Sequence, residues 1–272
     1  MRMWAGVLAV VCVVTGPAVQ AQSYSAFGFK PPADLIVPAF SDEELGALLT
    51  TLDSLVSGPA AQGRQSADAL WQFGRRLQTG RLSAPQENRV LAHLDGLVKA
   101  NDALGTAIAG TRRVIQQLTV GKPAPDIAGT DLTGQPFKLS DYKGKVVAVV
   151  FSAEWCAICK TQAPYERFLL GRYERWPFAL LTVQAGSDRK AAHAAFLADQ
   201  LAHRSWWDSP ADGATNGPIA EGWNVIGWPA TYLIDGTGVI RFVNVRDEDL
   251  LKAVRQLVDE QVSLDDKARR VK

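Results

Sequence analysis

A run of apolar, mostly β-branched residues leads into two closely spaced cysteines. Residues 146–151 read Val-Val-Ala-Val-Val-Phe, and residues 155–160 read Trp-Cys-Ala-Ile-Cys-Lys. A continuous apolar segment of this length, without polar alternation, predicts a strand that is buried on both faces of a parallel sheet. The Cys-x-x-Cys motif then lies where this strand passes into a helix, and that context is typical of redox chemistry.

The spacing of Cys156 and Cys159 suits the closure of a disulfide within one helical turn. The positive end of the helix dipole and the free N–H groups of the first turn favour the thiolate form of Cys156. A structural disulfide across two residues is the alternative, but closing so short a loop stabilises a fold little. A zinc site lacks a second Cys-x-x-Cys or a pair of histidines. We therefore predict a dithiol/disulfide enzyme, with no metal.

The N-terminus has the pattern of an export signal, which we assign to residues 1–21. Arg2 precedes an apolar segment at 3–14, and Val19-Gln20-Ala21 resembles a cleavage site. The apolar segment is short for a membrane span, which needs roughly 20 residues. An uncleaved anchor is the alternative, so membrane contact is expected only if the signal is retained. Cys12 lies in the signal, which leaves the motif's cysteines alone in an oxidising periplasmic or extracellular setting.

The following part, residues 22–119, predicts a small all-α domain. After a lead-in at 22–40, residues 41–44 (Ser-Asp-Glu-Glu) form a capping box. Further helices are expected at 66–79 and from 83 onward. The first helix should bury Leu45, Leu48, Leu49, Leu52 and Leu55.

An apolar seam with heptad-like spacing runs from Val90 to Leu118. It fits one long helix, or two helices with a break at Asn101-Asp102. We expect a helical hairpin or bundle, with dimerisation along the seam as a further possibility. No residue in 22–119 has recognisable chemistry. The formal net charge of +1 gives no reason to expect nucleic acid as a partner.

From residue 120 onward, strand and helix patterns alternate. A hairpin is expected at 129–139, strands at 146–151 and 178–183, and a helix at 187–201. A second hairpin at 230–243 and a closing helix at 247–261 follow. This alternation of strand and helix predicts βαβ units and a parallel sheet.

From Gly121 onward the chain resembles the thioredoxin superfamily, and within it the exported TlpA/ResA-type thiol–disulfide oxidoreductases of the redoxin (AhpC/TSA-like) group. The matching motifs are Gly121–Asp126, Leu139–Lys145, Trp155–Lys160, Pro164, Trp228–Thr231 and Asp235–Ile240. The resemblance implies a thioredoxin-like fold, a central mixed β-sheet flanked by helices, over residues 120–272. It does not cover the helical domain at 22–119.

The resemblance also implies roles for individual residues. Cys156, exposed at the strand–helix corner, would attack a partner disulfide, and Cys159 would resolve the mixed disulfide. Pro229 would follow a cis peptide bond, which is uncommon, and with Trp228 and Trp155 would form the substrate-binding surface. The redox-active disulfide holds the electrons, so no cofactor is implied. The partners would be protein thiols or disulfides and an upstream thiol redox protein.

Some positions depart from the family pattern. Thioredoxin carries a buried acid six residues before the nucleophile, where this chain has Val150. Proton transfer to or from Cys159 then falls to Glu154 or to water, and the direction of electron flow stays open. A thiol peroxidase is disfavoured because Ala153 replaces the Thr or Ser of peroxiredoxins. A non-catalytic thioredoxin-like binding or scaffold module is the other alternative. His203 is expected to be solvated.

Overall fold

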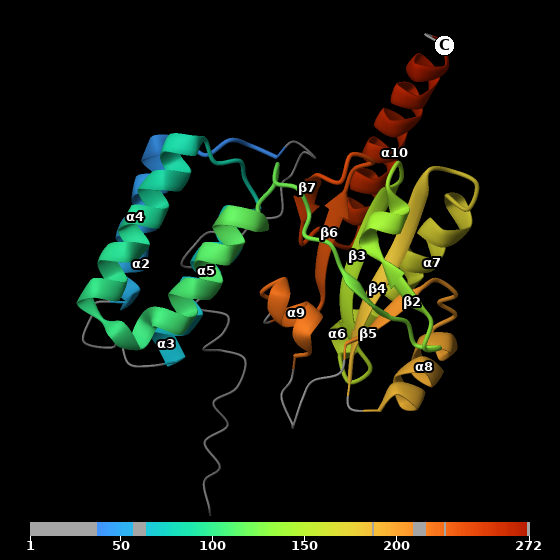
Figure 1. Cartoon of the computed structure of the whole chain (residues 1–272), viewed down its shortest axis with the longest axis horizontal. Helices are drawn as coiled ribbons and strands as arrows, with labels where there is room; N and C mark the ends of the chain where they lie inside the picture. Colours follow the sequence, from blue (N-terminus) through green and yellow to red (C-terminus); the bar gives the residue numbers. More distant parts are fainter. Residues whose placement is uncertain (1–36, 57–63, 187, 209–215, 226, 271–272) are drawn as a thin grey trace, which may run out of the picture.

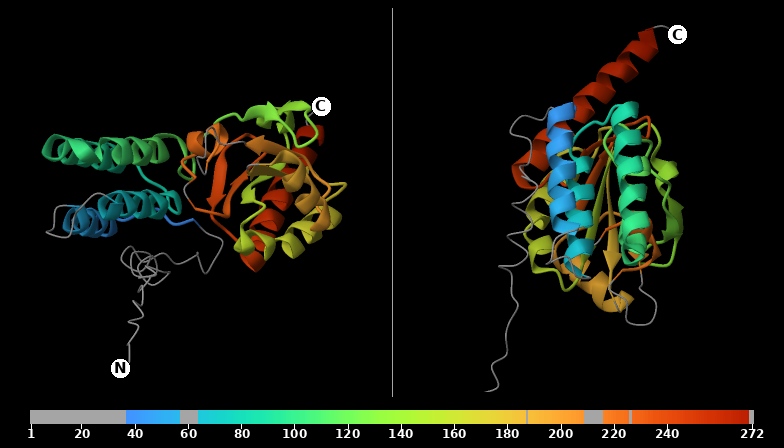
Figure 2. Two further views of the ribbon diagram at one scale, coloured as in Figure 1. Left: turned by 90° about the horizontal axis from the view of Figure 1, so that it is seen from below. Right: turned by 90° about the vertical axis from the view of Figure 1, so that its left-hand side faces the viewer.

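The computed structural model describes residues 37–56, 64–186, 188–208, 216–225 and 227–270. The predicted signal peptide at 1–21 lies outside them, as does most of the predicted lead-in. In this part of the chain, a group of helices packs beside an α/β unit, and the last helix projects beyond it (Figures 1 and 2). The boundaries assigned to the two domains stay a prediction.

The helical part consists of α2 (Asp42–Val56), α3 (Arg64–Gln78), α4 (Ala84–Ala100), a short 3-10 turn (Asp102–Leu104) and α5 (Gly105–Gln117). The capping box at the start of α2 is confirmed. The Glu44 amide donates to Ser41 Oγ at 3.1 Å, and the Ser41 amide donates to Glu44 Oε2 at 2.9 Å. The equivalent pair of bonds joins Ser83 and Gln86 at the start of α4. Both starts are local features, which is why sequence predicts them.

The apolar seam is divided between two helices. Asn101 adopts an extended conformation, and its Oδ1 accepts a hydrogen bond from the Ala103 amide at 3.1 Å. The seam residues pack inside the chain against α2 and α3, as the fully buried Val90, Leu94 and Ile115 show. The prediction for α2 was wrong at its end, because Leu55 is exposed while Val56 is buried.

The α/β part contains a hairpin of β1 (Ala128–Thr130) and β2 (Pro136–Lys138), and a five-stranded sheet in the order β5-β4-β3-β6-β7. Its strands are β3 (Val146–Ala153), β4 (Phe178–Ala185), β5 (Ser205–Asp208), β6 (Ala230–Ile234) and β7 (Ile240–Val243). Strands β3, β4 and β5 are parallel, whereas β6 runs antiparallel to β3 and β7. The predicted mixed sheet and thioredoxin-like fold are confirmed.

Helices cover both faces of this sheet. The α/β part adds α6 (Ala157–Lys160), α7 (Ala163–Arg172), α8 (Arg189–Ala198), α9 (Pro218–Gly222) and α10 (Asp247–Arg270). Helices α7 and α10 pack on one face, where Leu169 and Val254 are fully buried. Val114 of α5 and Leu118, the residue that follows this helix, share the core of the other face with Trp206 and Trp223. The helical part therefore contributes directly to the core of the α/β part.

Helix α10 extends to Arg270, beyond the Gln261 that the apolar stripe predicted. Its last turns carry mostly exposed polar side chains. These turns have no apolar stripe, so the sequence pattern did not predict them as helical. Among the described residues, no helix is both long enough and apolar enough to cross a membrane.

Candidate active site

The two cysteines lie at the carboxyl end of β3, the central strand, and are joined as a disulfide with a Cα–Cα distance of 5.3 Å. Cys156 is the N-cap of α6, and its Sγ accepts a hydrogen bond from the Cys159 amide at 3.1 Å. In the reduced protein we expect the same amide to donate to a Cys156 thiolate. A hydrogen bond to the charged form favours that form. The local backbone therefore supports Cys156 as the attacking sulfur.

The disulfide is less accessible than the sequence suggested. Cys156 was expected to be exposed, but Cys156 and Cys159 are each only 6% exposed. Both cysteines pack with Ala153 and Ala185, and the Trp228 side chain packs over this cluster. Trp228 lies far away in the sequence, so this cover was not visible in the motif itself. Trp155 and Ile158, by contrast, are 54% and 59% exposed beside the disulfide.

The loop before β6 faces the disulfide through Trp228. The Trp228–Pro229 peptide bond is cis, and Pro229 is buried. The Trp228 ring lies 6.1 Å from the Trp155 ring in an edge-on arrangement. Arg246, at the start of α10, donates a hydrogen bond from Nη2 to the Pro229 carbonyl at 2.7 Å, which fixes this loop. Trp155, Trp228 and Pro229 are thus brought together at one end of the sheet, while their roles in substrate binding stay predictions.

The helical part reaches the same loop. The Trp71 ring of α3 lies 3.3 Å from the point that a Cβ atom on Gly227 would occupy. Glycine at this position therefore permits close contact between α3 and the loop that carries Pro229. Gln78, near the end of α3, donates a hydrogen bond to Tyr232 Oη at 2.9 Å, two residues into β6. No sequence pattern indicated that the helical part borders the site.

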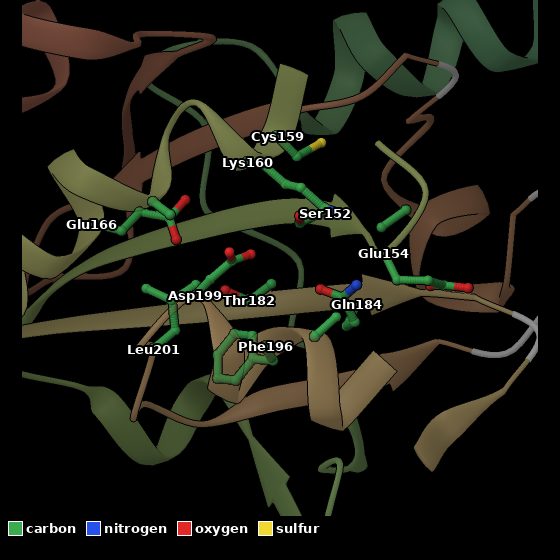
Figure 3. A pocket seen from close by; sticks show the side chains of 13 residues that line it. Ser152, Glu154, Cys159, Lys160, Glu166, Thr182, Gln184, Phe196, Asp199 and Leu201 are labelled. Atoms are coloured by element: carbon green, nitrogen blue, oxygen red, sulfur yellow. The ribbon is translucent and has the colours of Figure 1, made fainter. Parts of the chain in front are cut away.

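Glu154 is half-buried at the end of β3. Its carboxylate lies against Gly186, where any Cβ atom would collide with it, and its Oε2 is buried without a hydrogen-bond partner. Figure 3 shows this side chain directed away from Cys159. Its suggested part in proton transfer stays a prediction.

A second acid, which the sequence interpretation missed, lies behind Cys159. Glu166 of α7 is 5% exposed and lines a cavity of about 30 Å³ whose wall also includes Cys159. The pKa of Glu166 is raised to about 7, and burial is the largest cause. The carboxylate of Asp199 also contributes to the rise, and the Arg167 guanidinium partly opposes it. The signal was present in the spacing, because Glu166 lies three residues from both Ala163 and Leu169 on the buried face of α7.

His203 also differs from expectation, because it is partly buried and its ring makes specific contacts. One ring nitrogen, Nε2, lies 2.7 Å from Thr182 Oγ1, and the ring packs edge-on against Phe196. Burial lowers the pKa of His203 to about 3, so the imidazole is neutral at physiological pH. This neutral histidine and Thr182 lie next to the cavity that contains Glu166.

Comparison with known proteins agrees with this geometry. Residues 120–243 match the AhpC/TSA family. The thiol-disulfide oxidoreductase ResA of Geobacillus kaustophilus is 31% identical over 124 residues, which are 46% of this chain and 68% of the relative. The ResA of a Bacillus cereus strain is 28% identical over 156 residues, 57% of this chain and 87% of the relative.

Among solved structures, the thioredoxin domain of a thiol-disulfide oxidoreductase from Bacteroides vulgatus matches with a TM-score of 0.47 and 26% identity. It covers 52% of this chain and 99% of that one. The family match begins after the helical part, which spans 42–117. The central β3, its Cys-x-x-Cys turn and the ResA relatives together show that the chain is a thiol–disulfide oxidoreductase of the TlpA/ResA type, within the thioredoxin superfamily.

Proposed function

We propose that this protein exchanges disulfides with protein substrates outside the cytoplasm, through Cys156 and Cys159. The observation that carries the proposal is the position of the disulfide: it closes the end of the central strand, under Trp228 and beside the exposed Trp155 and Ile158. An apolar rim around a reactive disulfide suits the apolar side chains of another polypeptide. The electrons reside in the sulfurs, so the proposal needs no organic cofactor and no metal.

In the reducing direction, the Cys156 thiolate attacks one sulfur of a partner disulfide and forms a mixed disulfide, while the other partner sulfur leaves as a thiolate. Cys159 then attacks Cys156 Sγ. The Cys156–Cys159 bond forms, the bond to the partner breaks, and the partner is released with both sulfurs reduced. An upstream thiol protein would reduce the resulting disulfide again. In the oxidising direction the same steps run backward.

The predicted export signal at 1–21 supports a periplasmic or secreted location. A thiol pair that works there is exposed to an oxidising environment, which suits disulfide exchange with exported proteins. Because Cys156 is only 6% exposed in the oxidised state, an attacking partner thiolate must approach past Trp155 and Trp228. That approach route favours extended, flexible segments of a partner over compact surfaces.

An insulin reduction assay on the mature protein tests the proposal. We expect turnover with dithiothreitol as reductant, loss of turnover in Cys156→Ser, and a trapped mixed disulfide in Cys159→Ser. Equal activity of the mature protein and Cys156→Ser would refute it. Hydrogen peroxide as substrate identifies a peroxidase, for which we expect no turnover above Cys156→Ser. The reduction potential of the Cys156–Cys159 pair then ranks the protein among reductants or oxidants.

A further inference from the structure

The cavity behind Cys159 contains a buried acid, Glu166, that has no role in the disulfide exchange described above. The cavity is bounded by α6, α7, α8 and the ends of β3 and β4. In Figure 3, the carboxyl groups of Glu166 and Asp199 both point into this space, and Cys159 lies at its upper edge. The volume of about 30 Å³ is enough for one water molecule.

The Glu166 carboxylate is stabilised only partly, by the nearby charge of Arg167. No described residue donates a hydrogen bond to its carboxylate, and the side chain is almost fully buried. An acid in this position is costly to the fold when ionised. Buried acids of this kind are concentrated at functional sites, because there the cost serves a reaction.

Val150 cannot accept a proton, so a proton acceptor for Cys159 has to come from another residue. Val150 occupies the position of thioredoxin's buried acid, is 2% exposed, and packs in the apolar cluster with Leu169 and Tyr173. Val150 and Ser152 are alternate residues of β3, so they face the same side of the sheet. Ser152 lines the cavity that Glu166 enters from α7. The carboxyl group thus reaches the same side of the central strand from the covering helix.

We propose that Glu166 accepts the proton of Cys159, through a water molecule in this cavity, when Cys159 resolves the mixed disulfide. The inference rests on the proposed function. The Cys159 thiol gives its proton to the water as the water passes one to the Glu166 carboxylate. The Cys159 sulfur then bonds to Cys156 Sγ, and the partner leaves as a thiolate with the electron pair of the broken bond. A water relay is needed because no described contact joins Cys159 to the Glu166 carboxylate, although both residues line the cavity. The Cys159 sulfur is directed away from the cavity in the disulfide of Figure 3, and opening the disulfide frees this side chain to turn toward the water.

The surroundings suit proton exchange near neutral pH. The other titratable groups around the cavity are Lys160 on α6, Glu154 after β3, Arg167 on α7, Asp199 after α8, and His203 before β5. Arg167 donates a hydrogen bond to the Asp199 carbonyl at 2.8 Å and partly offsets the Asp199 carboxylate. Lys160 is exposed and His203 is neutral. An acid with a pKa of about 7 is efficient as acceptor and as donor at that pH.

The test follows the resolving step by itself. Reduced mature protein is mixed with glutathione disulfide, and the Cys156–glutathione adduct is followed by mass spectrometry from pH 5 to pH 10. In the wild type, we expect the decay rate of the adduct to rise with pH around pH 7. In Glu166→Gln we expect the adduct to accumulate, with decay slower by about 100-fold at pH 7, the lower range for a positioned base. The difference should narrow above about pH 8.5, where an ordinary thiol ionises without help.

Matched variants separate this role from a structural one. Glu174→Gln, an exposed change just beyond α7, should keep the wild-type profile, and Glu166→Asp should restore part of the rate. Adduct formation measured in Cys159→Ser should be the same with and without Glu166→Gln. Asp199→Asn should move the wild-type profile to lower pH, because it removes a neighbouring carboxylate that raises the pKa of Glu166. It also tests the proposal should Glu166→Gln fail to fold.

Superimposable profiles for wild type and Glu166→Gln would overturn the inference and leave the proposed function intact. So would a loss of rate in Glu154→Gln alone, which would identify Glu154 as the acceptor. If the wild-type protein forms no adduct with glutathione disulfide and reduces no insulin, the proposed function fails, and this inference fails with it.

Discussion

The burial of Glu166 predicts that replacing it by glutamine stabilises the protein at alkaline pH. Folding raises the pKa of Glu166 from 4.5 to about 7. Each tenfold change in a dissociation constant is worth about 1.4 kcal/mol, so the ionised carboxylate costs the folded state about 3 kcal/mol. The side chain is almost fully buried, so solvent screening reduces this figure little.

The sign follows from proton binding. Between pH 4.5 and about pH 7, the folded state holds a proton on Glu166 that the unfolded state has released. The free energy of unfolding therefore falls as pH rises through this window. The contribution is fully present below pH 4.5 and is lost above about pH 7. Glu166→Gln carries no titrating group and lacks this slope.

Urea unfolding of the oxidised protein at a series of pH values measures the effect. We expect wild type and Glu166→Gln to be similar near pH 4 and the variant to be more stable by up to about 3 kcal/mol at pH 8. His203, whose pKa falls from 6.5 to about 3, gives both proteins an opposite slope at acid pH. The His203 contribution therefore cancels when the free energy of unfolding of the wild type is subtracted from that of the variant. A constant difference across the pH range would refute the buried, raised-pKa acid.

Two further predictions concern the contact between the helical part and the active-site loop. In Trp71→Ala, the support of the loop at Gly227 is lost. We expect a higher KM for insulin, while dithiothreitol should reduce the disulfide at the wild-type rate. An unchanged KM would refute a role of this contact in substrate binding. In Tyr232→Phe, the hydroxyl that accepts a hydrogen bond from Gln78 at 2.9 Å is removed. We expect the free energy of unfolding, measured in urea, to fall by about 1–2 kcal/mol. A variant as stable as the wild type would contradict this prediction.

Sequence predicted the features of this protein that depend on neighbouring residues. The capping box at Ser41, the β3 strand and the Cys-x-x-Cys turn each follow from a short pattern, and all are present. The helix break at Asn101 depends on both local sequence and tertiary packing. The Asn101 side chain could cap a helix locally, and the structure uses that capacity to divide the seam. Only tertiary packing decided between one helix and two, because both fit the apolar spacing.

Features that depend on distant segments could not be predicted in the same way. Cys156 is covered by Trp228, which a turn at the end of β3 cannot indicate. Glu166 could be placed on the buried face of α7 from its spacing, but its nearness to Cys159 depends on how α7 crosses β3 and β4. His203 is shielded because Thr182 and Phe196 come together around it. Each of these outcomes requires the assembled sheet.

Strand β6 connects the two parts of the molecule in a way that neither predicts alone. It begins directly after Pro229 and pairs with β3 along the line that ends at the disulfide. Tyr232 in β6 also joins Gln78 of α3, and Trp71 of the same helix packs on Gly227. Because the strand is anchored on one side by the helical part and on the other by β3, we expect a shift of α3 to act on the loop that carries Trp228 and Pro229. The helical part therefore packs directly against the loop of the candidate active site.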